Sequence, residues 1–198
     1  MKVLGGRYLT EGDLARQGIK KLGSNVRIHE TVVLVDLERI EIGSNVRIDP
    51  YCVLSAAGGH LKIGSYIHIG SHNVTVAGGG VELADFVNLS QGVRIYSVSD
   101  DYTGESLTSP MIPRHLSRAL SGTVTLGRHV IVGSGSVILP QVTIGDGCAI
   151  GALSLVTHSL QDWGIYAGIP VRLLRARSRR LLADEAALIG AGSQQQSS

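Results

Sequence analysis

The sequence predicts an all-β protein whose chain coils as a three-sided parallel β-helix of about six turns. A six-residue unit recurs along the chain. Its positions hold, in order, an aliphatic residue, a small residue, two polar residues, a second aliphatic residue and any residue. It begins at Leu22, Ile42, Ile63, Leu83, Leu126 and Ile144. Glycine is frequent, with 26 residues, whereas the aromatic residues make up only 4%. The last two of these units lie 18 residues apart, which is one turn of three six-residue sides.

The repeat has a simple physical interpretation as a short strand followed by a sharp corner. In triplets such as Val26–Ile28 and Val46–Ile48, alternation directs the outer two side chains inward and the middle one outward. The residues between triplets, Gly-Ser-Asn or Gly-Asp-Gly, tolerate the positive φ of a corner. A strand and a corner every six residues therefore wrap the chain around a prism, which we place at residues 22–160.

One segment inside the prism does not follow the repeat. The units at Leu83 and Leu126 are 43 residues apart, and one turn accounts for only part of this gap. Residues 97–122 contain no hexads, so we expect them to form a long external loop. Such a loop in a repetitive scaffold is more often functional than idle.

Both ends of the column need caps, because open β-edges invite aggregation. At residues 1–21 we expect a helical cap, since Thr10–Asp13 resembles a helix start. Residues 161–198 are expected to form a C-terminal extension, with a helix after Pro170 and a disordered tail. The apolar stripe of that helix would consist of Leu173, Leu174, Leu181, Leu182 and Leu188.

Charge and composition limit the partners. The formal charge of +2 argues against nucleic-acid binding, which needs a concentrated basic surface. Cys52 and Cys148 lie 96 positions apart, so they indicate reduced thiols rather than a disulfide framework. No stretch of about 18 apolar residues is present, and the N-terminus lacks the apolar core of a signal peptide. We therefore expect a cytoplasmic protein without membrane insertion.

The hexads, the external loop and the closing motifs GALSLVT and DWGIYAGIPVR resemble the hexapeptide-repeat acyltransferases. The resemblance covers about Leu22 to Arg172, and it implies left-handed coils, a homotrimer and acetyl-CoA as co-substrate. The last coils match the galactoside and maltose O-acetyltransferases. The segment IYSVSDDYTGESLTSP is instead similar to the N-acetyltransferases that act on dTDP-4-amino-4,6-dideoxyglucose.

The start of the external loop carries the candidate chemistry. The O-acetyltransferases place a catalytic His where this sequence has Asp100. A hydroxyl needs the base strength of His, whereas a sugar amine is already partly neutral near pH 8, so aspartate favours an amine acceptor. Asp100 or Asp101 would orient the ammonium group and accept its proton, and Asp101 and Tyr102 are assigned to substrate binding. The alternative is that these residues form only a turn.

A second pair of candidates is His72 and Asn73. They fall near a segment that contributes an acceptor-contacting Asn in the galactoside branch, so either could face the acetyl group. His72 is thereby a second candidate base, and the alternative is that both are corner residues.

The resemblance also implies a coenzyme A site in the last coils. Ser134, with Gly135, matches a position near the thioester, and Ala152 offers backbone contacts to the pantetheine arm. Gly168 and Arg172 match the nucleotide end. Each of these residues could instead be an ordinary corner or chain exit.

Metal binding and assembly complete the expectations. Some hexapeptide prisms hold zinc with three His, but the spacing of His68 and His72 has meaning on a helix and not across a corner, so we expect no metal. The outward positions of the later triplets hold apolar residues such as Ile131 and Leu155, which favours packing against neighbouring copies in a trimer.

The sequence thus predicts an acetyl-CoA-dependent N-acetyltransferase that acts on a nucleotide-linked amino sugar for surface polysaccharide (O-antigen) biosynthesis. An O-acetyltransferase that acts on a saccharide hydroxyl is the alternative. A non-catalytic β-helix module is a third possibility, for which the YAGIPVR tail and the loop would be superfluous.

Overall fold

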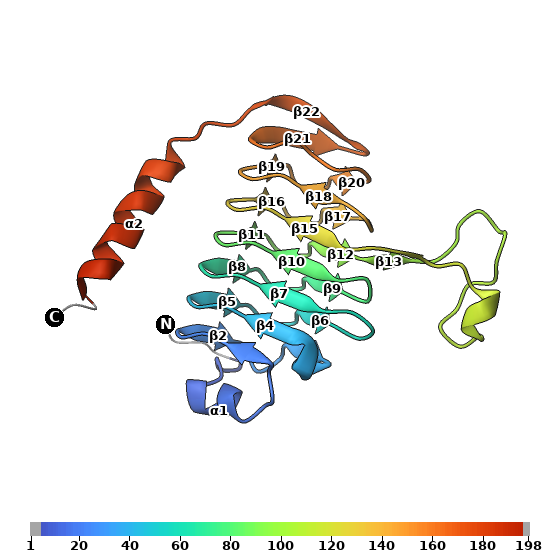
Figure 1. Cartoon of the computed structure of the whole chain (residues 1–198), viewed down its shortest axis with the longest axis horizontal. Helices are drawn as coiled ribbons and strands as arrows, with labels where there is room; N and C mark the ends of the chain where they lie inside the picture. The colour runs from blue at the N-terminus through green and yellow to red at the C-terminus, as the bar shows by residue number, and fades with distance from the viewer. Residues whose placement is uncertain (1–4, 196–198) are drawn as a thin grey trace.

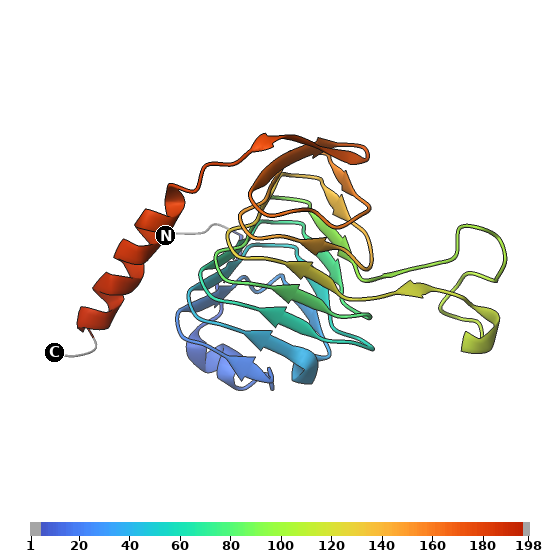
Figure 2. The same ribbon diagram turned by 45° about the horizontal axis from the view of Figure 1, so that its top comes forward.

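The computed structural model describes residues 5–195, and it confirms the predicted parallel β-helix. The chain coils through about seven turns, and Figures 1 and 2 show the coils rising with a left-handed sense. The hexads predicted about six turns because the last turn, from Leu160 to Gly168, lacks the regular spacing.

Three parallel sheets form the walls of the prism. Sheet 1 contains β1 (Lys21–Leu22), β4 (Ile40–Ile42), β7 (Leu61–Ile63), β10 (Val81–Leu83), β15 (Val124–Leu126) and β18 (Thr143–Ile144). Sheet 2 contains β2 (Val26–Ile28), β5 (Val46–Ile48), β8 (Ile67–Ile69), β11 (Asn88–Leu89), β16 (Ile131–Val132), β19 (Ala149–Ile150), β21 (Gly164–Gly168) and β22 (Val171–Ala176). Sheet 3 contains β3 (Val33–Val35), β6 (Val53–Ser55), β9 (Val74–Val76), β12 (Arg94–Tyr96), β17 (Val137–Ile138) and β20 (Leu155–Val156).

The core is a single column of aliphatic side chains inside these walls. In β2, Val26 and Ile28 are buried and Arg27 is exposed, as the alternation predicts. Sheet 3 has the opposite pattern, since the middle residue of β6, Leu54, is buried and its neighbours face outward. Coils stack in register, so that Val26 lies beside Val46 and Val46 beside Ile67. Burial of these residues away from water stabilises each turn.

The N-terminal segment contains the predicted helix, and residues 1–4 of the expected cap lie outside the described part of the chain. Helix α1 (Glu11–Ala15) begins after Thr10, whose side chain accepts a hydrogen bond from the amide of Asp13, while the Asp13 carboxylate accepts one from the Thr10 amide. Leu14 is buried against the first coil. The helix covers the open lower end of the column (Figure 1).

The C-terminal prediction needs two corrections. Residues Val171–Ala176, expected to be helical, form β22, which pairs antiparallel with β21 and buries Val171. The free edge of β21 outweighs the helix propensity of these residues. Helix α2 therefore begins only at Leu181, and it continues to Gln195 through most of the tail expected to be disordered. Residues 196–198 lie outside the described part of the chain.

The external segment leaves the prism as the missing hexads predicted. β13 (Val98–Ser99) and β14 (Leu120–Ser121) pair antiparallel and carry the chain away from sheet 3. A short helix, η2 (Arg114–Leu116), lies near the tip, and another, η1 (Leu37–Arg39), lies at a corner of the second coil. Figure 1 shows residues 97–122, called the arm below, projecting from the right-hand side of the column.

Candidate functional site

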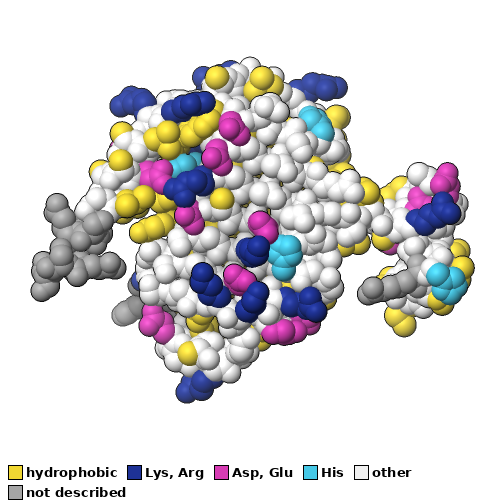
Figure 3. All heavy atoms as spheres, viewed as in Figure 1, with side chains coloured by type: hydrophobic (Ala, Val, Ile, Leu, Met, Phe, Trp, Pro, Cys, Tyr) yellow, Lys and Arg dark blue, Asp and Glu magenta, His cyan; other side chains and the backbone are white. Residues whose placement is uncertain are grey.

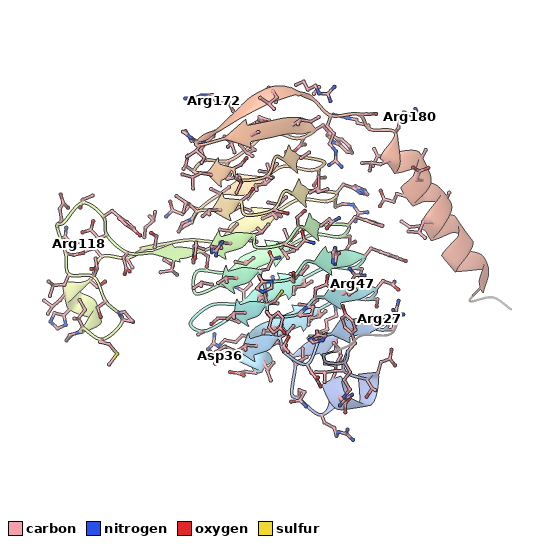
Figure 4. The ribbon with its side chains drawn as sticks, turned by 180° about the vertical axis from the view of Figure 1, so that it is seen from behind. Arg27, Asp36, Arg47, Arg118, Arg172 and Arg180 are labelled. Carbon is pink, nitrogen blue, oxygen red and sulfur yellow. The ribbon has the colours of Figure 1, made fainter. Side chains whose placement is uncertain are left out.

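Most of the predicted site residues stand on one edge of the prism, the corner between sheets 2 and 3, called edge 2/3. In successive coils this edge consists of Pro50–Tyr51, Ser71–His72, Gln91–Gly92, Ser134–Gly135 and Ala152–Leu153. Gly168 and Arg172 belong to the β21–β22 hairpin above the last of these coils, and Figure 4 labels Arg172 at that end of the column. Six candidates separated by up to 100 positions in sequence thus follow one line.

Edge 2/3 differs from the corner between sheets 1 and 2 in its free backbone donors. At that other corner, a side-chain oxygen of the next coil accepts the hydrogen bond of the amide, as Asp85 does for Ser65 at 2.8 Å and Asp146 for Arg128 at 2.8 Å. At edge 2/3 the amides of Ser71, Gln91, Ser134 and Ala152 have no acceptor within residues 5–195. A row of backbone N–H groups without partners is suited to bind the carbonyl oxygens of an extended ligand.

The middle of edge 2/3 is narrow because glycine replaces side chains there. Gly135 has φ +71°, and a Cβ at this position would lie 2.8 Å from Cδ2 of Leu153. The Ser134 hydroxyl donates to Oε1 of Gln91 in the coil below, at 3.2 Å. The thioester is expected beside these residues, between His72 and Leu153.

His72 and Asn73 are adjacent in sequence but have different surroundings. His72 is exposed at the corner with φ +61°, and its ring lies 5.2 Å from that of Tyr51. Asn73 points into the prism with 1% exposure, and its Nδ2 donates to the carbonyls of Gly70 and Ser90 at 2.7 and 2.8 Å. A side chain held this way braces two coils, so we retain His72 and not Asn73 in the proposed site.

Asp100 lies at the root of the arm, in a hollow of about 500 Å³ open to solvent. The walls are mainly apolar and consist of Val76, Tyr96, Val98, Ser99, Tyr102, Val137 and Leu139. Within the described residues the carboxylate of Asp100 makes no hydrogen bond or ion pair, and only its backbone carbonyl accepts a bond, from Ser99 Oγ at 3.4 Å. The carboxylate is therefore available to an incoming cation.

Asp101 is committed to the fold of the arm. Its carboxylate accepts bonds from the Thr103 amide at 2.7 Å, the Thr103 hydroxyl at 2.6 Å and the Ser106 hydroxyl at 2.9 Å. The hydrogen bonds from Thr103 lower the pKa of Asp101 to about 2. Tyr102 is 92% exposed beside it. The turn interpretation thus fits Asp101, whereas the carboxylate of Asp100 has no partner among the described residues.

The two groups of candidates lie on opposite borders of sheet 3. Edge 2/3 precedes the strands of sheet 3 and the arm leaves after β12, so the three residues of Arg94–Tyr96 separate them. At about 3.3 Å per residue this separation is roughly 10 Å. Asp100 and His72 therefore do not meet within one copy of the chain.

Sequence reasoning missed the walls of the hollow. Tyr96, Val137 and Leu139 occupy outward positions of sheet 3, and the alternation of the triplets could have placed them there. Gln91 was also missed, because its contact with Ser134 joins coils 43 positions apart. Knowledge of the coil register is required to find such a pair.

Within residues 5–195, no three His, Cys, Asp or Glu side chains gather as ligands for a metal ion. Neither α-helix in this part of the chain is long and apolar enough to cross a membrane.

A parallel β-helix with an external arm and a polar glycine-containing edge defines a hexapeptide-repeat transferase. Residues 123–158 match the family described as bacterial transferase hexapeptide (six repeats). The dTDP-4-amino-4,6-dideoxy-D-glucose acyltransferase of Escherichia coli is 40% identical over 175 residues, which cover 88% of this chain and 91% of that protein. Galactoside O-acetyltransferase from Escherichia coli K12 is 31% identical over 68% of this chain and 62% of its own length.

A solved structure extends the similarity to the whole fold. The N-acyltransferase AntD of Bacillus cereus, in complex with dTDP and 3-hydroxybutyryl-CoA, superposes with a TM-score of 0.91 at 38% identity. The superposition covers 94% of this chain and 98% of AntD. The chain belongs to the hexapeptide-repeat acyltransferases.

Proposed function

We propose that the protein transfers an acyl group from acyl-CoA to the amine of a nucleotide-linked amino sugar of the dTDP-4-amino-4,6-dideoxyglucose type. The observation that carries this proposal is the similarity over nearly the full length to an acyltransferase named for that sugar. The free carboxylate of Asp100 in a hollow beside sheet 3 supports it, because an ammonium group needs an uncommitted anion. Acetyl is the acyl group we expect.

In the proposed mechanism the amine attacks the thioester directly, in a ternary complex of the enzyme with both substrates. Asp100 holds the ammonium group and accepts one proton, which frees the lone pair of the amine. The amine attacks the thioester carbonyl carbon, the C–S bond of the tetrahedral intermediate breaks, and the leaving thiolate takes up the remaining proton. Backbone amides such as that of Ser134, which has no acceptor within the described residues, would donate to the developing oxyanion. His72 is the second candidate for proton transfer.

For coenzyme A we propose edge 2/3. Ser134 and Gly135 would lie beside the thioester, the Ala152 amide would bind the pantetheine arm, and Gly168 and Arg172 would contact the nucleotide end. The free amides of Ser134 and Ala152 support this placement. The exposed guanidinium of Arg172 supplies a cation at the end where the phosphates are expected.

We further propose a homotrimer that completes the site. The outer face of sheet 3 is apolar, and Val33, Val35 and Val53 are 50%, 37% and 38% exposed. Because Asp100 and edge 2/3 lie on opposite borders of this sheet, a neighbouring copy is needed to bring them together. Cyclic packing of one copy's arm root against the edge of the next meets this need.

Mixing two inactive variants tests the shared site. Asp100→Asn removes the base, and Ala152→Trp blocks edge 2/3 with a bulky side chain at an exposed position. When the two chains are refolded together in equal amounts, about a quarter of the shared sites receive both intact halves, so about a quarter of the activity should return. A mixture no more active than its components contradicts the shared site.

The acceptor is tested by a substrate panel. Acetyl-CoA is offered with dTDP- and UDP-linked 3-amino and 4-amino sugars and with plain galactosides, and release of the coenzyme A thiol is followed. We expect transfer to a nucleotide-linked amine, with cytoplasmic synthesis of a surface polysaccharide such as O-antigen as the setting. Transfer to galactosides alone would instead establish the O-acetyltransferase alternative.

A further inference from the structure

Three basic side chains form a column on the outer face of sheet 2. Arg27, Arg47 and His68 occupy the outward positions of β2, β5 and β8, and the strands pair so that each residue lies directly beside the next. Adjacent coils are about 4.8 Å apart. Figure 4 labels Arg27 and Arg47, which lie one above the other on the same side of the β-helix. We call these three residues the basic column.

Among the residues that the structure describes, Asp49 is the only carboxylate paired with the basic column. Asp49 Oδ1 lies 3.0 Å from Arg47 Nε, and Asp49 Oδ2 lies 2.8 Å from His68 Nε2. Tyr8 donates its hydroxyl to Asp49 at 2.7 Å. Burial raises the pKa of Asp49, but the hydrogen bonds from His68 and Tyr8 and the charge of Arg47 together hold it below its usual value. Both carboxylate oxygens of Asp49 are thus already paired with Arg47, His68 and Tyr8.

Arg27 remains without a counter-ion. It is exposed, and within residues 5–195 it makes no ion pair and no hydrogen bond through its guanidinium. Its neighbour in the next coil is Arg47, another cation. Like charges directly opposite each other in a sheet are destabilising, so this end of the column has positive charge in excess.

The outer face of sheet 1 shows the opposite arrangement. There Lys21, Glu41, Lys62 and Glu82 lie in register and alternate in sign. Lys62 contacts Glu82 at 2.8 Å, and Figure 3 shows positive and negative side chains intermixed over the lower half of this face. The charges on the outer face of sheet 1 therefore balance one another, whereas those on sheet 2 do not. The excess positive charge on sheet 2 indicates a binding site for an anion.

We infer that the basic column binds the diphosphate of the nucleotide-linked acceptor. This inference rests on the proposed function, because it takes the acceptor to be a nucleoside diphosphate sugar. Arg27 offers a free guanidinium fork for two phosphate oxygens, and Asp49 fixes the orientation of Arg47. Inorganic phosphate, coenzyme A and a nucleoside diphosphate all carry phosphate groups that arginine could bind. The position of the basic column favours the nucleoside diphosphate as its ligand.

The heights of the residues along the column agree with this assignment. The residues proposed for coenzyme A lie at the coil of β16 and above, while Asp100 follows β12 in the coil below. His68, Arg47 and Arg27 lie one, two and three coils lower again, which is roughly 5, 10 and 14 Å. A nucleotide sugar with its amine at Asp100 would cover this range from the far side of its hexose ring to its two phosphates. Asp100 of one copy and the basic column of the next would thus hold the two ends of one acceptor sugar.

Calorimetric titration of the full chain with dTDP, and separately with coenzyme A, tests the site. Arg27→Gln removes the cation that has no partner in the fold, so the protein should fold normally. We expect its Kd for dTDP to rise at least about tenfold, with its Kd for coenzyme A within twofold of the parent. Added salt should weaken dTDP binding more in the parent than in the variant. Lys21→Gln, which removes an exposed cation from sheet 1 in the same coil, should change neither Kd.

Two results overturn the inference. Unchanged dTDP affinity in Arg27→Gln and in the double variant Arg27→Gln/Arg47→Gln would place the nucleotide elsewhere, even with normal acyl transfer by the parent. Weakened coenzyme A binding would assign the column to the co-substrate. Failure of the proposed function has a different signature, since the parent would then bind dTDP through the column without acylating any nucleotide sugar.

Discussion

Replacement of Asp100 by Asn separates chemistry from structure. The carboxylate makes no hydrogen bond or ion pair within residues 5–195, and asparagine keeps the shape of the side chain, so the free energy of unfolding should change by less than about 0.5 kcal/mol. The amide cannot accept the proton of an ammonium group. Loss of one positioned base typically reduces turnover by about 10²-fold or more, which corresponds to at least about 2.7 kcal/mol of activation free energy.

The assay follows thiol release at saturating acetyl-CoA and acceptor, with calorimetry for coenzyme A. We expect turnover to fall about 100-fold and the Kd of coenzyme A to stay within twofold. Asp101→Asn is the matched control, since it removes the same charge next door but acts on the turn held by Thr103 and Ser106. It should make the arm more sensitive to proteolysis. Turnover of Asp100→Asn within threefold of the parent would refute the role of this carboxylate.

Three further predictions concern the scaffold. Burial raises the pKa of Tyr8 to about 12, so the protonated phenol stabilises the N-terminal cap below pH 10. This stabilisation is lost as the pH rises toward 12. Tyr8→Phe should therefore remove a late step from the ultraviolet titration of tyrosine. Gly147→Ala should lower the free energy of unfolding by about 2–4 kcal/mol in urea denaturation, because φ is +65° and the new Cβ would clash with the Trp163 ring. Gly18→Ala, with φ +80° and open space around the new Cβ, should lower it by only about 1 kcal/mol. Glu185→Gln should increase hydrogen exchange in α2, because Glu185 ties that helix to Arg128 and His129; unchanged exchange would mean that other contacts hold the helix.

The fold was predictable because its rule is local. Each coil repeats the same relation between neighbouring residues, so the triplet Val26–Ile28 already specifies which side chains face the core. The N-terminal cap was predictable for the same reason, since Thr10 and Asp13 are three residues apart. β22 was missed because its strand conformation depends on the unpaired edge of β21, which local helix propensity does not contain.

The candidate site was only partly predictable. The hexad register aligns His72, Ser134 and Ala152 on one edge, and a reader of the sequence can count coils to find it. The different surroundings of Asp100 and Asp101 could not be predicted from the repeat, because hydrogen bonds from Thr103 and Ser106 decide which carboxylate is free. Neither could the inward rotation of Asn73, which depends on carbonyl groups in two different coils.

Identification of the product of acyl transfer is the most direct test of the central claim. The full chain is incubated with isotopically labelled acetyl-CoA and dTDP-4-amino-4,6-dideoxyglucose, and the labelled nucleotide sugar is isolated and treated with hydroxylamine. An amide at the sugar nitrogen resists this treatment, and we expect the label to stay on the sugar. Label released by hydroxylamine, as from an ester, would contradict transfer to the amine.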